Sequence, residues 1–431
     1  MKAREKHKST SEINLKQSIS IGIGGMVGGG IFAVLGLAVA LAQGGTPIAF
    51  LFAGIIAAIT AYSYSKLSLV FPDRGGTVKF INVGFGKTIF SGAINNLLWV
   101  SYIIMLSLYA SAFGSYAPNL YSLTNNLSLD FHIYLSGIIV IATIINYYSI
   151  SVVSKIETYA VIVKLLILLT FVVFGIYGLF KSANVHQLSI ANWENPLSLI
   201  SAGMIIFVAY EGFELIANAV PDIQNPNSNV PKAYAYSVWF VVFLYIIIAI
   251  ITVGSLSFSQ ISSAQDYVLA EAAKPLVGQL GFTIITIAAL ISTFSAINAT
   301  LYGGSRVSFE LAEDDELPHH LASMLWNKPI GLLISAILTL LIANLLNLES
   351  ISTAGSAGFL LIFAMVNYTA FKYSKLLNSK RYWHLAGFLL CIAAFIILLI
   401  QQFNSNMEGV VVVILIIITC FMFEFMYKKI N

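Results

Sequence analysis

The sequence predicts an all-α integral membrane protein with twelve transmembrane helices. Hydrophobic residues fill 58% of its 431 positions and charged residues only 10%, against roughly 25% charged in an ordinary soluble domain. The mean hydropathy is +0.87, and apolar runs long enough to cross a bilayer recur along the whole chain. In lipid, only helices and closed barrels satisfy their backbone groups, and runs of this length are helices.

The apolar runs place the twelve spans in one transmembrane domain over residues 1–431. They lie at about 17–42, 46–70, 89–118, 131–151, 156–180, 197–219, 234–256, 281–311, 329–347, 351–371, 383–402 and 409–427. The connection around 257–280 is expected to carry a short interfacial helix on the outer face. The loop 312–328 is expected to be a solvated cytoplasmic turn. It carries four successive acids, Glu313, Asp314, Asp315 and Glu316.

The basic residues predict that both termini are cytoplasmic. With the N-terminus inside, only Lys181 and Lys274 of the 22 lysines and arginines lie in outer connections. This asymmetry follows the positive-inside rule, and an even number of spans agrees with it. The net charge of +3 gives no indication of nucleic-acid binding. The cytoplasmic set begins with Lys2, Arg4, Lys6 and Lys8.

The two cysteines, Cys391 and Cys420, lie in the last two spans. Neither is in an outer loop, so no disulfide-linked partner chain is expected, and the thiols are lipid-facing or packing groups. The sequence has no convincing metal-ligand spacing and no nucleophile with a nearby base. We therefore expect neither a metal or other cofactor nor an enzymatic activity.

The first span is unusually rich in glycine. Residues 21–32, IGIGGMVGGGIF, contain six glycines, and each costs a helix about 1 kcal/mol relative to alanine. One interpretation is that the helix stops and restarts near the bilayer midplane, so that free N–H groups face a ligand. The other is a small-residue packing face, because Gly24 and Gly28 have the spacing of such contacts, as do Gly25 and Gly29.

The sixth span has a second interruption. In FVAYEGFE, residues 207–214, Glu211 and Glu214 flank Gly212. The two interrupted spans are five helices apart and therefore enter the membrane from opposite sides. Interrupted segments in corresponding positions of two halves are typical of inverted-repeat transporters and of their binding sites. This pairing favours the helix break over the packing face in the first span.

Four motifs resemble one known family, the amino acid–polyamine–organocation (APC) transporter superfamily, and within it the proton-coupled prokaryotic amino acid permeases. They occur in order and cover helices one to eight, whereas the last two spans match by hydropathy alone. The motifs are GGMVGGGIF (24–32), AYSYSKLSLVFPDRGGTVKFI (61–81), IFVAYEGFELIANAVPDIQNPNSNVPKA (206–233) and STFSAINATLYGGSRVSFELAEDDELP (292–318).

The resemblance implies a LeuT-like fold, a five-plus-five inverted repeat in which helices one and six are broken. Helices one to five (about 17–180) and six to ten (about 197–371) would form the repeats, and two helices (about 383–427) would be appended. It also implies a secondary amino acid transporter that works by alternating access in the plasma membrane of a prokaryote.

The resemblance places the substrate at the two breaks. The N–H groups of Gly28, Gly29 and Gly30 begin the second half of helix one and are expected to bind the α-carboxylate. The amine of the substrate is expected to meet free carbonyl groups of both breaks. These carbonyls belong to Met26, Phe207, Val208 and Glu211.

Members of the family usually carry an aromatic gate in the sixth-helix break. Here Val208 occupies one position that is often aromatic, while Phe207 and Tyr210 are available. The apolar pocket that results favours a neutral L-amino acid. In the third span, Asn95 and Asn96 are expected near the pocket wall, although an asparagine inside a membrane more often bonds a neighbouring helix.

Lys164 lies about halfway along the fifth span. An ionisable residue inside the membrane is costly, so its presence indicates a functional site. The resemblance places it where sodium-coupled relatives hold sodium between helices one and eight. Its expected partners are the carbonyls of Gly24 and Val27 and a hydroxyl of Ser292 or Ser295. Three roles stay open: a proton-coupling group, a fixed charge as in exchangers, or a lipid-facing lysine.

The two glutamates of the sixth span have different expected roles. Glu214 resembles a family acid that braces the broken helix. Glu211 either caps the second half-helix or pairs with a cationic substrate or a proton. The resulting prediction is proton-coupled symport of neutral amino acids. The alternatives are amino acid exchange and a cationic amino acid or polyamine carrier, and a nutrient sensor without transport ranks last.

Overall fold

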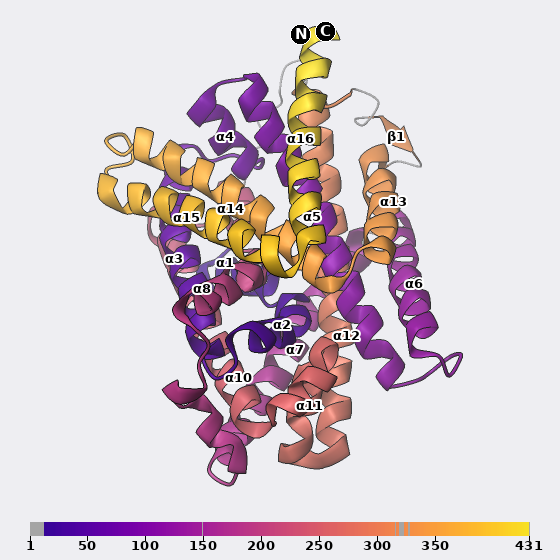
Figure 1. Ribbon diagram of the computed structural model, residues 1–431. Coiled ribbons are helices and arrows are strands. Elements are labelled where there is room, and N and C mark those ends of the chain that lie inside the picture. Colours follow the sequence, from indigo (N-terminus) through magenta and orange to yellow (C-terminus); the bar gives the residue numbers. More distant parts are fainter. Residues whose placement is uncertain (1–12, 149, 315, 319–322, 326–327, 431) are drawn as a thin grey trace.

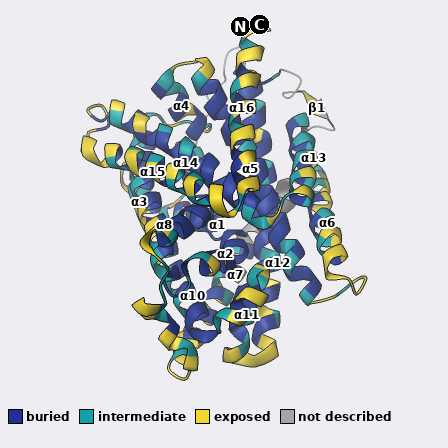
Figure 2. Ribbon diagram, viewed as in Figure 1, coloured by how far each residue is buried: buried dark blue, intermediate teal, exposed yellow. Residues whose placement is uncertain are grey.

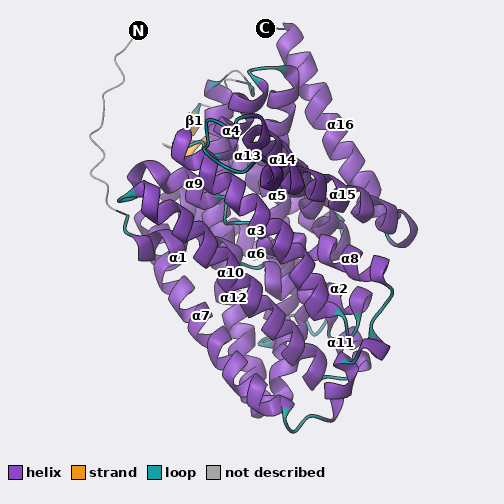
Figure 3. Ribbon diagram, turned by 90° about the vertical axis from the view of Figure 1, so that its left-hand side faces the viewer, coloured by secondary structure: helices purple, strands orange, loops and turns teal. Residues whose placement is uncertain are grey.

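The computed structural model describes residues 13–148, 150–314, 316–318, 323–325 and 328–430 (Figure 1). Ten helices in these ranges are long and apolar enough to cross a membrane, and the bent pair α1 (Leu15–Met26) and α2 (Gly30–Ala42) makes an eleventh candidate. The apolar helix α13 (Ile330–Leu345) is shorter. Within the described residues the fold is all-helical apart from loops and one small strand pair, as Figure 3 shows.

The other elements follow in chain order, with 3₁₀ helices labelled η. They are α3 (Thr46–Val70), α4 (Thr77–Phe85), α5 (Ile89–Tyr116), η1 (Ala117–Asn119), α6 (Leu127–Tyr148), α7 (Ile150–Leu179), η2 (Ala183–Leu188), η3 (Ile190–Asn192), α8 (Pro196–Ile205), η4 (Ile206–Tyr210), α9 (Leu215–Ala219), η5 (Val220–Asp222), α10 (Pro226–Ser255), α11 (Phe258–Ser263), η6 (Gln265–Tyr267), α12 (Val268–Glu313), β1 (Met324–Leu325), β2 (Lys328–Pro329), α14 (Leu348–Lys372), α15 (Arg381–Ser405) and α16 (Met407–Ile430). The two strands pair antiparallel.

Local capping signals begin several of these helices. Asn14 caps α1 in a capping box, in which its side chain accepts from the backbone of Gln17 and the Gln17 side chain accepts from the backbone of Asn14. Thr88 and Ser91 form the same arrangement at the start of α5. Pro196 occupies the first position of α8, where its missing N–H has no cost. Polar residues that flank the apolar runs therefore set these helix boundaries.

The structure corrects one expected boundary and adds one helix. Helix α10 begins at Pro226, eight residues before the expected start at 234, so the polar stretch that precedes the seventh apolar run is helical. Helix α4 is absent from the expected spans, because its nine residues are too few to cross a membrane. It buries Val78 and Ile81 and packs against α14.

The connection around 257–280 is helical, as predicted. It contains α11 and the first part of α12, which is interrupted at Gly278, where φ is 68°. Figure 1 places α11 at the end of the molecule opposite to α4, β1 and the end of α16. Several residues used in the predictions lie outside the described residues. They are Lys2, Arg4, Lys6, Lys8 and Asp315.

The interior of the molecule is formed by α5 and by the segment from α8 to η5. Within the most apolar stretch of each, 83% and 89% of the residues are buried, against 28% for α6, α15 and α16. Figure 2 shows the same distribution, with exposed residues along the outer helices. Cys391 and Cys420 are free and buried, so they are packing groups and not lipid-facing ones.

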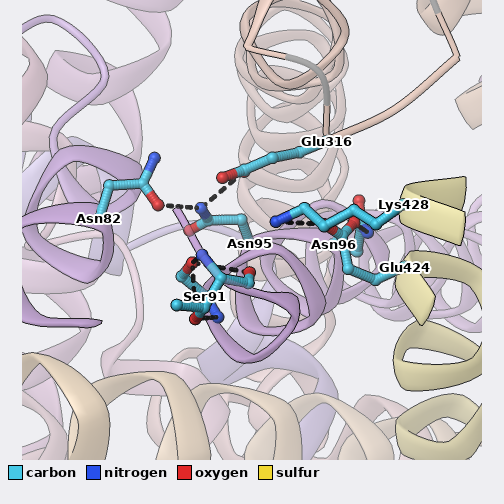
Figure 4. A network of polar contacts seen from close by, with 8 residues as sticks. Asn82, Ser91, Asn95, Asn96, Glu316, Glu424 and Lys428 are labelled. Atoms are coloured by element: carbon cyan, nitrogen blue, oxygen red, sulfur yellow. Dashed lines mark hydrogen bonds and ion pairs between the residues drawn. The ribbon is translucent and has the colours of Figure 1, made fainter. Parts of the chain in front are cut away.

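A buried polar network joins α4, α5 and the loop after α12 at one end of the molecule (Figure 4). The Asn95 amide donates to Asn82 Oδ1 over 3.0 Å and to Glu316 Oε2 over 2.7 Å. Next to it, the Asn96 amide donates over 3.1 Å to Glu424 of α16. Both asparagines therefore bind neighbouring elements, the more frequent role of an asparagine inside a membrane.

Glu316 is also not the solvated residue that the acidic loop predicts, because it is only 1% exposed. Burial raises the pKa of its carboxyl above the ordinary value of 4.5, although the hydrogen bond from Asn95 lowers it in part. Its neighbour Asp314 is exposed in part and pairs with Lys87 over 3.0 Å. The run of acids is thus divided between a buried and a solvated role.

We expect Glu316→Gln to raise the melting temperature of the purified protein at neutral pH. Because folding raises the pKa of the Glu316 carboxyl, this group favours the folded state when the pH is below the unfolded value of 4.5. The stabilising contribution is lost as the pH rises through the folded pKa. Glutamine keeps an oxygen for Asn95 and carries no charge. The difference in melting temperature between the variant and wild type should therefore become smaller below pH 4.5. Thermal unfolding over a pH series measures this, and a variant less stable than wild type at neutral pH would contradict it.

Candidate substrate-binding site

The first span is broken at its glycines. Helix α1 ends at Met26, α2 begins at Gly30, and their axes differ by 48°. Gly29 stands at the N-cap position of α2, and no side chain caps it there. The first N–H groups of a helix have no acceptor within the helix, and its N-terminus carries a partial positive charge. This end of α2 is therefore suited to an anion.

The sixth span is interrupted as well. Helix α8 passes into the 3₁₀ helix η4, and helical geometry stops at Glu211, which is extended with φ −65° and ψ 149°. Gly212 follows with φ 117°, a conformation that residues with a side chain rarely adopt. Helix α9 then begins at Leu215. The break therefore depends on the glycine that the two glutamates flank.

The two interruptions touch each other through their backbones. A Cβ atom on Gly212 would lie 2.4 Å from the carbonyl carbon of Gly25, and one on Gly25 would lie 2.6 Å from the oxygen of Gly212. Gly30 is similarly close to the backbone of Ala209, because a Cβ atom added to Gly30 would lie 2.9 Å from the Cα atom of Ala209. The glycines of the first span thus provide both a helix break and a close packing face, which the sequence alone presents as alternatives.

Lys164 binds the first break from α7. Its Nζ donates to the carbonyl oxygen of Gly24 over 3.1 Å, and the residue is fully buried. This burial excludes the lipid-facing role. A hydrogen bond from an ammonium group to a carbonyl is charge-assisted and therefore stronger than a neutral one.

Helix α12 binds the same break from another side. The Ser292 hydroxyl donates to Gly28 O over 2.8 Å and lies 3.3 Å from Val27 O. Ser295 is buried one helical turn further on, and its hydroxyl has no hydrogen-bond partner among the described residues. Of the partners expected for Lys164, the structure places Gly24 at its ammonium group and Val27 at Ser292.

Both glutamates of the sixth break are buried. Glu214 Oε2 accepts from the N–H of Gly212 over 2.8 Å, which is the geometry of a brace across the break. Glu211 Oε2 lies 3.5 Å from the hydroxyl of Tyr109. The second carboxylate oxygen of Glu214 has no hydrogen-bond partner in the described part of the chain. Two acidic groups thus share a site with the glycine backbone.

Tyr109 of α5 connects the two breaks, and no sequence motif predicts this role. A Cβ atom on Gly29 would lie 2.5 Å from the Tyr109 ring, and one on Gly28 would lie 3.5 Å from its hydroxyl oxygen. The same hydroxyl reaches Glu211. Tyr109 is one of 21 tyrosines in the chain, so its residue type gives no local signal either.

Two of the carbonyls expected to bind the substrate amine already have partners. The Tyr245 hydroxyl donates to Met26 O over 2.7 Å, and the N–H of Glu211 donates to Val208 O over 3.3 Å. A carbonyl oxygen can accept a second hydrogen bond, so both stay available to a ligand.

The aromatic residues of the sixth break have different environments. The Tyr210 hydroxyl donates to Phe50 O over 2.9 Å and is therefore turned toward α3. Phe207 packs edge-on against Phe363 of α14, with the ring centroids 6.0 Å apart. The N–H of Val208 donates to the Ser356 hydroxyl over 3.0 Å, so α14 holds this part of η4 in place.

Comparison with known proteins identifies relatives over nearly the whole chain. A family model described as amino acid permease matches residues 13–426. An uncharacterized protein of Methanocaldococcus jannaschii is 34% identical over 97% of this chain and 96% of its own length. The inner membrane transport protein YbaT of Escherichia coli is 32% identical over 84% of each chain. The serine/threonine exchanger SteT of Bacillus subtilis is 26% identical over 71% of this chain and 69% of its own.

Proposed function

Because the chain belongs to the amino acid permease family of the APC superfamily, we propose that it is a secondary transporter of neutral L-amino acids, driven by protons through alternating access. The observation that carries this proposal is the bond from the buried Lys164 to Gly24 within the first break. It supports a coupling group placed directly against the substrate site. The serine/threonine specificity named for one relative agrees with a small neutral substrate.

The proposed substrate site lies where the two breaks meet. The substrate carboxylate would bind the N–H groups of Gly28, Gly29 and Gly30 at the start of α2. Its ammonium group would bind backbone carbonyl oxygens of the two breaks, those of Met26, Phe207, Val208 and Glu211. These contacts recognise the backbone of any α-amino acid, so the side chain is selected by the apolar residues around them.

The proposed coupling step uses the protonation of Lys164. In its protonated form the ammonium group holds α7 against α1 at Gly24, next to the contacts that Ser292 makes with Val27 and Gly28 between α1 and α2. A neutral amine is a weaker donor, so release of the proton would loosen α1 from α7. Each proton taken up from one side would thereby favour one orientation of the site.

The proposed arrangement in the membrane has twelve crossings with both termini in the cytoplasm of a prokaryote, at its plasma membrane. The broken segment α1–α2, the ten long apolar helices and the shorter α13 supply these crossings. The proposed inverted repeat pairs helices one to five with six to ten, and α15 and α16 are appended.

Two other modes of transport have support in particular observations. The name of the relative SteT, a serine/threonine exchanger, favours exchange as an alternative to symport. The buried Glu211 favours a carrier of cationic amino acids or polyamines, because a carboxylate in the site could bind a second positive charge.

The Glu211→Gln variant distinguishes the last alternative. For a carrier of neutral amino acids we expect uptake to fall by no more than about tenfold, the cost of one ordinary hydrogen bond. Uptake of the labelled amino acids should be measured side by side with that of arginine and spermidine. A selective loss of the cationic compounds would favour the cationic carrier over our proposal.

The proposal is tested with the purified protein in liposomes and a panel of labelled neutral and cationic amino acids and polyamines. We expect a neutral amino acid to accumulate under an inward proton gradient and not in its absence. Accumulation that ignores the gradient and requires preloaded amino acid would establish an exchanger instead. No movement of any compound in the panel would refute the substrate class.

A further inference from the structure

A groove on the outer surface of the helix bundle lies apart from the two helix breaks. It is formed by α3, α10 and the start of α15 and has a volume of about 870 Å³. Its walls are mainly apolar and aromatic, with Ile55, Ile59 and Tyr62 from α3, Trp239 from α10 and Trp383 from α15. Ile55, Trp239 and Trp383 are exposed, so the groove opens outward.

A second cavity of about 330 Å³ adjoins this groove and shares Tyr62 and Trp239 with it. Each cavity contains one cation, Lys380 in the larger and Lys66 in the smaller, and no acidic residue lines either. Within the described residues neither lysine forms an ion pair with a carboxylate. Lys66 Nζ lies 5.6 Å from the centre of the Tyr62 ring, so the two side chains are neighbours. The joint groove therefore carries uncompensated positive charge.

The wall between the two lysines is held in place by a buried histidine. The His384 ring stacks on Tyr62 with the centroids 5.3 Å apart. Its Nδ1 is hydrogen-bonded to Ser63 Oγ over 2.8 Å and its Nε2 to Ser379 Oγ over 2.7 Å. The residue next to Ser379 is Lys380. These contacts connect α3 to the loop before α15, so the groove is formed before any ligand binds, and binding orders few groups.

The groove also has the polarity of a phospholipid. Ile55 and Lys66 are eleven residues apart on α3, which corresponds to roughly 16 Å along the helix. Lys66 lies toward the end of α3 that leads to α4, whereas Ile55 lies near the middle of the helix. The groove therefore passes from apolar walls in the membrane interior to two cations, with tyrosine and tryptophan between them, as is usual at a membrane interface.

We propose that this groove binds an anionic phospholipid of the leaflet on the α4 side. The lipid phosphate and headgroup lie between Lys66 and Lys380, and an acyl chain lies along Ile55, Ile59 and Trp239. Basic pockets between transmembrane helices recognise acidic headgroups in this way. A bound lipid would connect α3, α10 and α15 and stabilise the folded protein by mass action. The proposal requires only that these helices span a membrane.

The test is native mass spectrometry of the purified full-length protein with phosphatidylglycerol and phosphatidylcholine of identical acyl chains. We expect wild type to retain phosphatidylglycerol preferentially. The double variant Lys66→Ala/Lys380→Ala should lose this preference. The affinity for phosphatidylglycerol should fall about fivefold for each lysine removed. Trp239→Ala should lower the retention of both lipids. Lys375→Ala is the matched control, because this exposed lysine is close in sequence to Lys380 and lines neither cavity.

Several results would overturn the proposal. Equal retention of the two lipids by wild type would show that the cations do not select a headgroup, and an unchanged preference in the double variant would place the lipid elsewhere. Displacement of the lipid by inorganic phosphate would identify a free anion as the ligand. Lys66→Gln/Lys380→Gln keeps more of the side-chain volume and is used if the alanine variant does not fold. It should lose the same preference, and retention of the preference would refute the site.

Discussion

Lys164→Ala is expected to lower gradient-driven uptake of amino acids by roughly ten- to hundredfold, the range that corresponds to a hydrogen bond from a charged group. In the structure, the ammonium group is buried and donates to Gly24 in the first break. Alanine removes both the contact and the titratable group, so α1 loses its connection to α7. Uptake into liposomes under an inward proton gradient measures the effect.

Lys181→Ala is the control for this experiment. Lys181 follows the end of α7, is exposed, and lies over the ring of Tyr177. Its loss removes a positive charge from the same part of the chain without touching the broken helices, so uptake should be close to that of wild type. If Lys164→Ala accumulated amino acids as wild type does, Lys164 would have no part in coupling.

Gly212→Ala is expected to abolish transport and to lower the melting temperature. The added Cβ would lie 2.4 Å from the carbonyl carbon of Gly25, and φ at this position is 117°. Backbone strain of this kind costs about 1–3 kcal/mol, and overpacking of a tight contact costs a further amount of about the same size. Because the contact joins the two breaks, the substrate site would be displaced together with the backbone. Thermal unfolding and uptake by the same preparation measure the two effects.

Gly303→Ala is the matched control. Gly303 lies in α12, and an added Cβ there would meet no atom within 4 Å. Alanine is a better helix former than glycine by about 1 kcal/mol, so this variant should be at least as stable as wild type and should transport normally. A Gly212→Ala protein that behaved like Gly303→Ala would show that the Gly25–Gly212 contact has no part in the transport site.

The long apolar helices and both breaks could be predicted because their signals are local. Runs of apolar residues indicate helices wherever they occur, and the glycines of the first span interrupt a helix through their own conformational freedom. Lys164 could be singled out for the same reason, because an ionisable residue within an apolar run is energetically costly and therefore indicates a function. These features need no knowledge of what lies beside them in space.

Contacts between distant residues could not be predicted in the same way. Tyr109 is 102 positions from Glu211, and its neighbours in the sequence give no sign that the two meet. The burial of Glu316 depends on Asn95, 221 positions away. The run of acids around Glu316 resembles a solvated turn, and the sequence does not show that Glu316 meets Asn95 of α5. Helix α4 escaped prediction because nine residues do not form a recognisable span.

The most direct test of the account is to follow protons and amino acid together. Liposomes that contain the purified protein and a trapped pH-sensitive dye receive an amino acid from the uptake panel, without an imposed gradient. We predict that its entry acidifies the interior in wild type and that the acidification disappears in Lys164→Ala. Amino acid entry through the wild-type protein without any change in internal pH would contradict proton coupling.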